Sequence, residues 1–269
     1  MSSAVRRGLV ATLVVFTVLA AVAFGLVVLW RVAQTHSTTE QCKVGDFSVE
    51  PDQASVAATM VGVVIKRDLP ERAAVLALAA ALQESKLTNL PGGDRDSVGV
   101  LQQRPSQGWG SPAQLQDIHY ATGKFLDALV KIDGWQTMPL ADAIQQVQVS
   151  IDGSYYARHE DEAQALSDAL SGKNPAGIIC SFPKPTQVAS VATVAAAVAQ
   201  DLPVSKPTAA STKITVPGAS WATAAWFVAN ADKYGIDAVD YAGRQWTRAK
   251  GWKNDKAAGS NAVVATMQT

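Results

Sequence analysis

A glutamate near the end of an apolar helix is the side chain in this sequence best suited to acid catalysis. The run from Ala73 to Leu82 contains no polar residue, which predicts a helix buried on every side, and Glu84 lies in its last turn. Desolvation and the negative end of the helix dipole both raise the pKa of a carboxyl group placed there. A carboxylic acid that stays protonated near neutral pH can give its proton to the leaving oxygen of a glycosidic bond. The alternative is a glutamate that points into solvent beside Lys86.

Two aspartates that could assist this acid lie in a long polar segment, residues 88–116. A loop of this length inside a compact domain is usually functional. Asp94 and Asp96 flank Arg95, which would keep both carboxylates ionised and therefore suited to be bases or ligands rather than acids. The alternative is a polar loop with Asx turns. The spacing resembles the start of a calcium-binding loop, but Pro105 stands where a bidentate glutamate is needed, so no metal site is predicted.

Two short motifs resemble the goose-type lysozyme and soluble lytic transglycosylase superfamily. Gln83-Glu84-Ser85 stands at the helix end, and Gly99-Val100-Leu101-Gln102 begins fifteen residues after the glutamate. In that superfamily a helix-end Glu-Ser is followed by a Gly-Leu-Met-Gln-like segment that lines the glycan cleft. The resemblance covers residues 50–172 and implies a lysozyme-like helical domain. It also implies that Glu84 is the general acid/base, that Gln102 and Ser85 bind substrate, and that no cofactor is needed.

The substrate that this resemblance implies is the β-1,4 bond between N-acetylmuramic acid and N-acetylglucosamine in peptidoglycan. A second carboxylate about 6.5–9.5 Å from Glu84 would support an inverting hydrolase, or muramidase. Without that base, the resemblance implies a lytic transglycosylase, in which the C6 hydroxyl of the sugar attacks. The Tyr-Asn-Ala-Gly motif of transglycosylases is absent, and Ser154-Tyr155-Tyr156-Ala157 stands in its region. This departure favours the alternative function, a non-catalytic peptidoglycan-binding or scaffolding protein with the same fold.

Two aromatic residues could contact a sugar chain. Trp109 is flanked by Gly108 and Gly110, which would allow its indole to be presented for stacking. Its alternative role is to anchor the loop in the core. Tyr155 and Tyr156 begin a helix, and one of them could reach the cleft. We select Tyr155 as the candidate ligand, with core packing as the alternative for both.

The N-terminus carries a long apolar segment. Residues 8–30 contain no charged side chain and would span roughly 34 Å as a helix, enough to cross a hydrocarbon core of about 30 Å. Arg6 and Arg7 precede the segment and Arg31 follows it, which favours a cytoplasmic N-terminus. The sequence therefore predicts a single-pass anchor within residues 1–31, in the cell membrane, with the remainder extracytoplasmic. The alternative is a cleaved signal peptide with Ala21-Val22-Ala23 at its cleavage site.

The two cysteines, Cys42 and Cys180, bracket a segment of ordinary domain size. In an exported protein they are predicted to form a disulfide, since disulfides persist outside the cytoplasm. The alternative is two independent thiols.

The predicted fold class is α+β, with a transmembrane helix, an all-α lysozyme-like domain and a small C-terminal α+β module. In the domain, residues 42–180, caps and breakers predict helices over 51–66, from 70 onward, over 117–131, 140–149 and 156–170. Residues 181–212 read as an Ala/Pro/Thr-rich linker with a possible helix over 188–202. The module, residues 213–269, is predicted to hold strands over 213–216 and 262–267, a helix over 221–234, and a hairpin turning at Ala242-Gly243.

The charges of the chain exclude one class of partner. There are 23 Lys and Arg residues against 23 Asp and Glu residues, so the net charge is zero and no nucleic-acid partner is expected. The predicted partners are peptidoglycan glycan strands, and the membrane through residues 8–30. Protein partners are not specified by the sequence.

Overall fold

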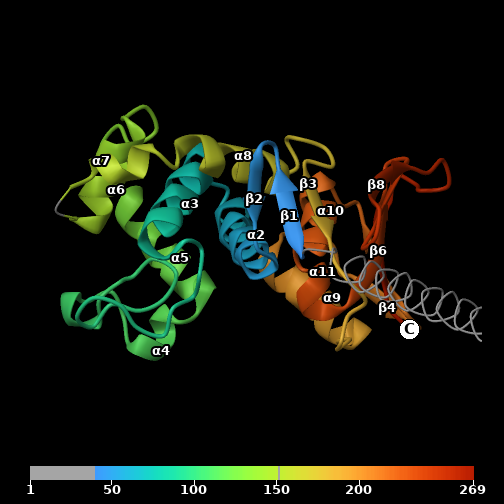
Figure 1. Cartoon of the computed structure of the whole chain (residues 1–269). Coiled ribbons are helices and arrows are strands. Elements are labelled where there is room, and N and C mark those ends of the chain that lie inside the picture. The colour runs from blue at the N-terminus through green and yellow to red at the C-terminus, as the bar shows by residue number, and fades with distance from the viewer. Residues whose placement is uncertain (1–39, 151) are drawn as a thin grey trace, which may run out of the picture. The chain divides into compact units, whose positions relative to one another are not determined.

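The helices of the first half begin and end at caps and breakers in the sequence. The computed structural model describes residues 40–150 and 152–269 (Figure 1). Helix α2 (Pro51–Lys66) has proline in its first turn, and Glu50 and Gln53 form a reciprocal capping box there. Helix α3 (Glu71–Ser85) follows Pro70, and helix α5 (Ile118–Leu129) is capped by the side chain of Asp117. These three helices confirm the predicted ones.

The region predicted as one helix over residues 156–170 contains two. The other helical segments of this half are η1 (Pro105–Gln107), α4 (Pro112–Leu115), α6 (Leu140–Gln148), α7 (Ser154–Ala157) and α8 (Glu160–Leu170). Three consecutive acidic residues form the first turn of α8, where the helix dipole stabilises negative charge. These residues favour the start of a new helix at Glu160, which explains why α7 ends at Ala157 instead of continuing into α8.

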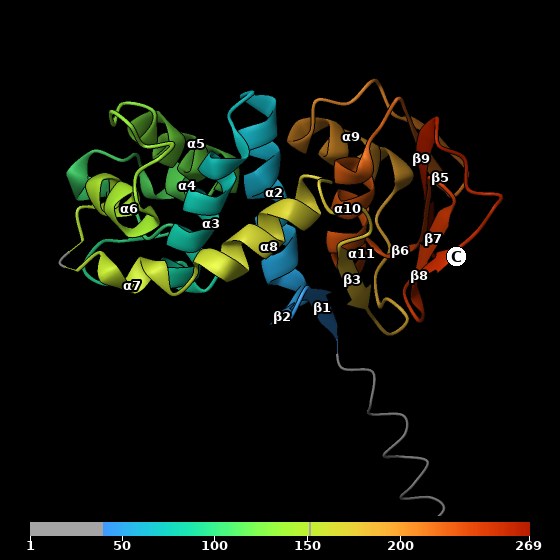
Figure 2. The same cartoon turned by 90° about the horizontal axis from the view of Figure 1, so that it is seen from above.

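Helix α3 is the centre of this half. Residues 73–82 are all buried, and the helix contacts α2, α5, α6, α7 and α8, as Figures 1 and 2 show. An Ala-rich helix can be surrounded in this way because its small side chains allow neighbouring helices to approach closely. Burial on every side fixes the position of Glu84 at its C-terminal end.

The predicted all-α character of residues 42–180 is wrong. Strands β1 (Gln41–Val44), β2 (Phe47–Val49) and β3 (Ile178–Ser181) form a three-stranded antiparallel sheet in the order β2-β1-β3. The turn between β1 and β2 is Gly45-Asp46, and Gly45 has a φ of +58°, which glycine adopts without the steric cost of a Cβ. The two-residue turn between short alternating strands is a hairpin signal, but no strand was predicted there.

The transmembrane helix of the predicted fold class is also not found. Among the described residues, no helix combines the length and the apolar character needed to cross a bilayer. The predicted anchor, residues 8–30, lies outside the described residues.

The C-terminal part is built on a six-stranded antiparallel sheet in the order β4-β5-β9-β6-β7-β8. Its strands are β4 (Thr208–Ala210), β5 (Lys213–Pro217), β6 (Ile236–Tyr241), β7 (Arg244–Thr247), β8 (Gly251–Asn254) and β9 (Ala262–Met267). Its helices are α9 (Val191–Asp201), α10 (Trp221–Ala229) and α11 (Ala231–Tyr234). The predicted hairpin is formed by β6 and β7 with its turn at Ala242-Gly243. The predicted helix over 221–234 is divided at Asn230, and strands β4 and β8 were not predicted.

Residues 40–269 form one compact unit, and helix α10 lies at its centre, between α2 and the large sheet (Figure 2). Residues 222–229 of α10 are all buried.

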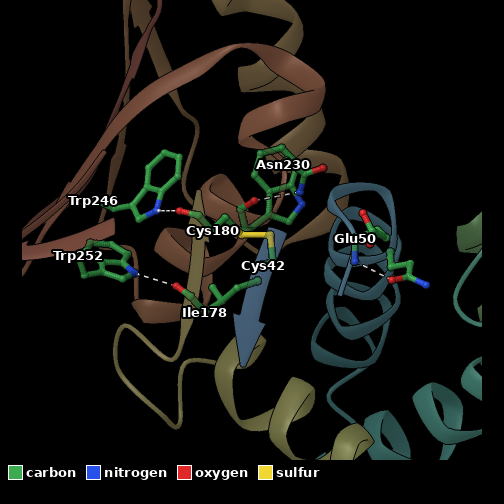
Figure 3. Close-up of a disulfide and its surroundings, with 9 residues drawn as sticks. Cys42, Glu50, Ile178, Cys180, Asn230, Trp246 and Trp252 are labelled. Atoms are coloured by element: carbon green, nitrogen blue, oxygen red, sulfur yellow. Dashed lines mark hydrogen bonds between the residues drawn. A yellow bond between two sulfur atoms is a disulfide. The ribbon is translucent and has the colours of Figure 1, made fainter. Parts of the chain in front are cut away.

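Hydrogen bonds also join the two sheets. The indole N–H of Trp246 donates to the Cys180 carbonyl over 3.0 Å, and that of Trp252 donates to the Ile178 carbonyl over 2.9 Å (Figure 3). The large sheet therefore supports the strand that holds Cys180.

A histidine between two carboxylates links α5 to the C-terminal part. The Nε2 atom of His119 lies 2.7 Å from Asp201 Oδ1, and its Nδ1 atom lies 3.2 Å from Asp117 Oδ1. The hydrogen bond to Asp201 is the main cause of a raised His119 pKa. Burial alone would raise the pKa of Asp201, but hydrogen bonds from His119, Trp226 and Thr59 hold it below its usual value. Only a protonated imidazole carries a proton on both nitrogens, so this geometry fits the charged ring.

Replacement of His119 by glutamine is expected to flatten the pH dependence of stability above neutral pH. The stabilisation from protonated His119 is complete below the pKa of an unfolded histidine, about 6.5, and is lost as the pH rises through the higher pKa of the folded state. The free energy of unfolding should therefore fall more between about pH 6 and pH 9 in the wild type than in His119→Gln. Urea unfolding at a series of pH values measures this, and equal slopes for the two proteins would contradict it.

Candidate functional site

Glu84 lies where two clefts meet. The first cleft has a volume of about 520 Å³ and the second of about 480 Å³, and Glu84 and Ser150 line both. The other residues of the first cleft are Asp94, Arg95, Ser97, Gln102, Gln103, Arg104, Gln107, Trp109, Gln148 and Val149. Those of the second are Gln83, Asp152, Tyr155 and Tyr156. A chain-like ligand that occupied both clefts would contact Glu84, which lines both.

The environment of Glu84 favours the protonated acid. Burial of the side chain is the largest effect and raises its pKa, while hydrogen bonds from Tyr156 and Gln148 oppose this without reversing it. The hydroxyl of Tyr156 donates to Glu84 Oε1 over 2.6 Å. Glu84 is thus held in one orientation, and its pKa lies above that of an ordinary glutamate, as general acid catalysis near neutral pH requires.

Tyr156 is a site residue that sequence reasoning did not select. Its side chain is 1% exposed and only its hydroxyl reaches the acid. Burial is the main cause that raises the Tyr156 pKa, with the hydrogen bond to Glu84 adding to it, so the phenol stays protonated and acts as a donor. The signal was available in Ser154-Tyr155-Tyr156-Ala157, which stands in the region of the transglycosylase tyrosine motif. Tyr155, the tyrosine selected from the sequence as a substrate ligand, lines the second cleft, whereas Tyr156 bonds to the acid.

Replacing Tyr156 with phenylalanine is expected to shift the pH profile of any activity that uses Glu84 as an acid. The tyrosine hydroxyl stabilises the carboxylate, so its removal raises the pKa of Glu84 further. Activity that needs protonated Glu84 declines as the pH rises through that pKa, and the declining limb should therefore move to higher pH. A pH–rate profile of wild type and Tyr156→Phe measures the shift. A limb that stays in place, or that moves to lower pH, would show that this hydrogen bond does not tune the acid.

The second motif forms a tight turn beside the acid. Gly99 has a φ of +82°, and a Cβ there would lie 2.2 Å from the Leu115 carbonyl oxygen, so only glycine fits. The side chain of Gln102 lines the first cleft, accepts from the Ser97 hydroxyl over 2.9 Å and donates to the Gly99 carbonyl over 2.9 Å. Gln102 is therefore placed in the cleft with its amide already oriented.

Ser85 does not line either cleft. It is 8% exposed, and its hydroxyl donates to the Val100 carbonyl over 2.7 Å and accepts from the Thr88 N–H over 3.2 Å. These bonds fasten the end of α3 to the glycine turn. The serine next to the acid therefore has a structural contact, and its predicted substrate contact has no support in this geometry.

The two candidate aspartates occupy different surroundings. Asp96 accepts from the Ser106 backbone N–H over 2.7 Å and from Arg104 Nε over 2.8 Å, and these bonds hold its pKa well below the usual range. It does not line the first cleft. Asp94 does line it, but its side chain is 94% exposed, and its ion pair with Arg95 is 3.9 Å long. Asp96 fixes the loop, and Asp94 is the carboxylate of this pair that reaches the cleft.

The aromatic candidates line different clefts. Trp109 lines the first cleft while it also packs against the core, and its carbonyl accepts from the Tyr120 hydroxyl over 3.3 Å. Tyr155 lines the second cleft, is 53% exposed and lies under the guanidinium of Arg158. Among the described residues, no group of three or more metal-binding side chains is present.

No protein-family model matches this chain, and no curated protein matches it. The resemblance to lysozymes and lytic transglycosylases therefore rests on the two short motifs. Function has to follow from the geometry around Glu84.

Proposed function

We propose that this protein cleaves the β-1,4 bond between N-acetylmuramic acid and N-acetylglucosamine in peptidoglycan, with Glu84 as the general acid/base. The observation that carries the proposal is the position of a partly buried carboxyl group, whose pKa is raised by burial, on the lining shared by two clefts. A sugar chain that lies in both clefts places a glycosidic oxygen within reach of this proton. Such a chain would meet Trp109 in the first cleft and Tyr155 in the second.

The surroundings of the acid favour a lytic transglycosylase over a hydrolase. An inverting hydrolase needs a second carboxylate held in place to activate water. Within the described residues, the other carboxylates of the clefts are Asp94, which is almost fully exposed, and Asp152, which accepts from the Ser154 N–H over 2.9 Å. Neither is positioned as firmly as Glu84.

A single carboxyl group is sufficient for the transglycosylase reaction. Glu84 donates its proton to the glycosidic oxygen as the bond from that oxygen to C1 of N-acetylmuramic acid breaks. The C6 hydroxyl of the same sugar then attacks C1, and the Glu84 carboxylate takes up the hydroxyl proton. The products are a 1,6-anhydro sugar end and a free C4 hydroxyl, and no water is consumed.

The disulfide supports an extracytoplasmic place of action. Cys42 and Cys180 are joined by a 2.01 Å S–S bond, and such bonds persist in oxidising compartments. Peptidoglycan lies in the same compartment, so substrate and protein would meet there.

Digestion of purified peptidoglycan by the full chain tests the proposal. Soluble fragments with 1,6-anhydro ends, identified by mass spectrometry, are the expected result. Fragments with reducing ends would instead indicate a hydrolase that uses Asp94 or Asp152 as its base. Binding to peptidoglycan without soluble product would favour a non-catalytic binding protein.

A further inference from the structure

Val149 adopts a backbone conformation that is costly for its side chain. It caps the C-terminal end of α6 with a φ of +51° and a ψ of +41°, in the left-handed region. Among the described non-glycine residues with positive φ, it is the one that is β-branched, the type for which this region is most unfavourable. Asparagine or glycine would make the same turn with less strain.

The side chain of Val149 gains nothing from burial that would offset this cost. It is 82% exposed, the largest value among the exposed large hydrophobic residues of the described chain. Neither the backbone conformation nor side-chain packing therefore favours valine at this position. A strained conformation of this kind points to a function at the position.

Val149 also belongs to the candidate site. It lines the first cleft and lies in the chain between Gln148, whose amide donates to the Leu101 carbonyl, and Ser150, which lines both clefts. Most of its neighbours in the first cleft are polar or charged. The exposed valine is therefore an apolar group presented to a ligand beside the catalytic acid.

We propose that Val149 is a specificity residue that contacts the methyl group of an acetamido substituent on the bound sugar. This inference rests on the proposed function, because it assumes that the first cleft holds an N-acetylated glycan. The hydroxyl and ring-oxygen groups of sugars suit the polar lining. The acetamido methyl is apolar, and its contact with an apolar side chain lowers the free energy of binding because both groups leave water.

Val149→Asn tests this by opposite effects on stability and on binding. The probes are a β-1,4-linked N-acetylglucosamine tetramer and the corresponding glucosamine tetramer, titrated into the full chain by calorimetry. We expect Val149→Asn to raise the midpoint of thermal unfolding by about 2–4 °C, because strain is relieved. Its affinity for the acetylated tetramer should fall about five- to tenfold, and its affinity for the glucosamine tetramer should change little.

Val130→Asn is the matched control. Val130 is also exposed at a helix end, but its backbone is right-handed and it does not line the first or the second cleft. This substitution should neither stabilise the protein nor change either affinity. Equal losses for the two tetramers in Val149→Asn, unchanged binding of both, or no binding of either by the wild type would each overturn the inference. The comparison of the two affinities does not depend on cleavage. It can therefore hold even if Glu84 proves not to be the catalytic acid.

Discussion

Glu84→Gln is expected to lower the rate at which the protein releases soluble fragments from peptidoglycan by about 10³-fold. Glutamine has nearly the same shape as protonated glutamic acid and can accept the hydrogen bond from Tyr156, but it has no acidic proton to give. The clefts should therefore keep their form and still bind glycan. Since a neutral side chain replaces one whose charged form is disfavoured by burial, the midpoint of thermal unfolding should stay the same or rise.

Glu162→Gln provides the control for this substitution. Glu162 lies on α8, its pKa is also raised by burial, and it lines neither the first nor the second cleft. Glu162→Gln should therefore release fragments at the wild-type rate. Time courses of fragment release, with product identity checked by mass spectrometry, measure both variants. Wild-type activity in Glu84→Gln would show that another group donates the proton and would remove the basis of the proposed mechanism.

Those helices were predictable whose ends or burial are set by residues close by in the chain, such as a proline, a capping side chain or an apolar run. Pro70, the capping residue Asp117 and the apolar run of α3 each act within a few residues of the chain, and the structure follows them. Strand β3 was missed because its pairing with β1 joins residues 178–181 to residues 41–44, a contact that no local pattern encodes, whereas the β1–β2 turn was a local signal that was overlooked. Strand β8 was missed for a related reason, since it is short and lies at the edge of its sheet.

The candidate site was predictable to the extent that it depends on one element. The position of Glu84 at the end of a buried helix follows from the sequence of α3 alone. The bond between Tyr156 and Glu84 depends on how distant segments meet, and the contacts of Ser85 and Asp96 depend on how the loop after α3 folds back, so these could not be derived. Spacing shows that a residue is near the acid in sequence, but it does not show whether its polar atoms are free for substrate or already bonded within the protein.

Removing the disulfide is expected to have the largest effect on stability. Cys42 and Cys180 are directly opposite each other in the β1–β3 pair, their Cα atoms are 3.9 Å apart, and both are fully buried (Figure 3). Their sequence separation is 138 residues, and closing a loop of this length stabilises the folded state by about 5 kcal/mol through the entropy of the unfolded chain. The double variant Cys42→Ala/Cys180→Ala should therefore unfold about 10–20 °C below the wild type.

Thermal unfolding followed by circular dichroism, with and without a reducing agent, separates the cross-link from the packing of the two side chains. Reduction should bring the wild type close to the double variant and should leave the double variant unchanged. A wild-type midpoint that reduction does not move, although the thiols are shown to be free, would mean that the loop is closed by packing alone. Neither cysteine lines the first or the second cleft, so at temperatures where the double variant is folded it should still cleave peptidoglycan. The disulfide would then determine the stability of the folded state, whereas the residues of the two clefts around Glu84 would determine the activity.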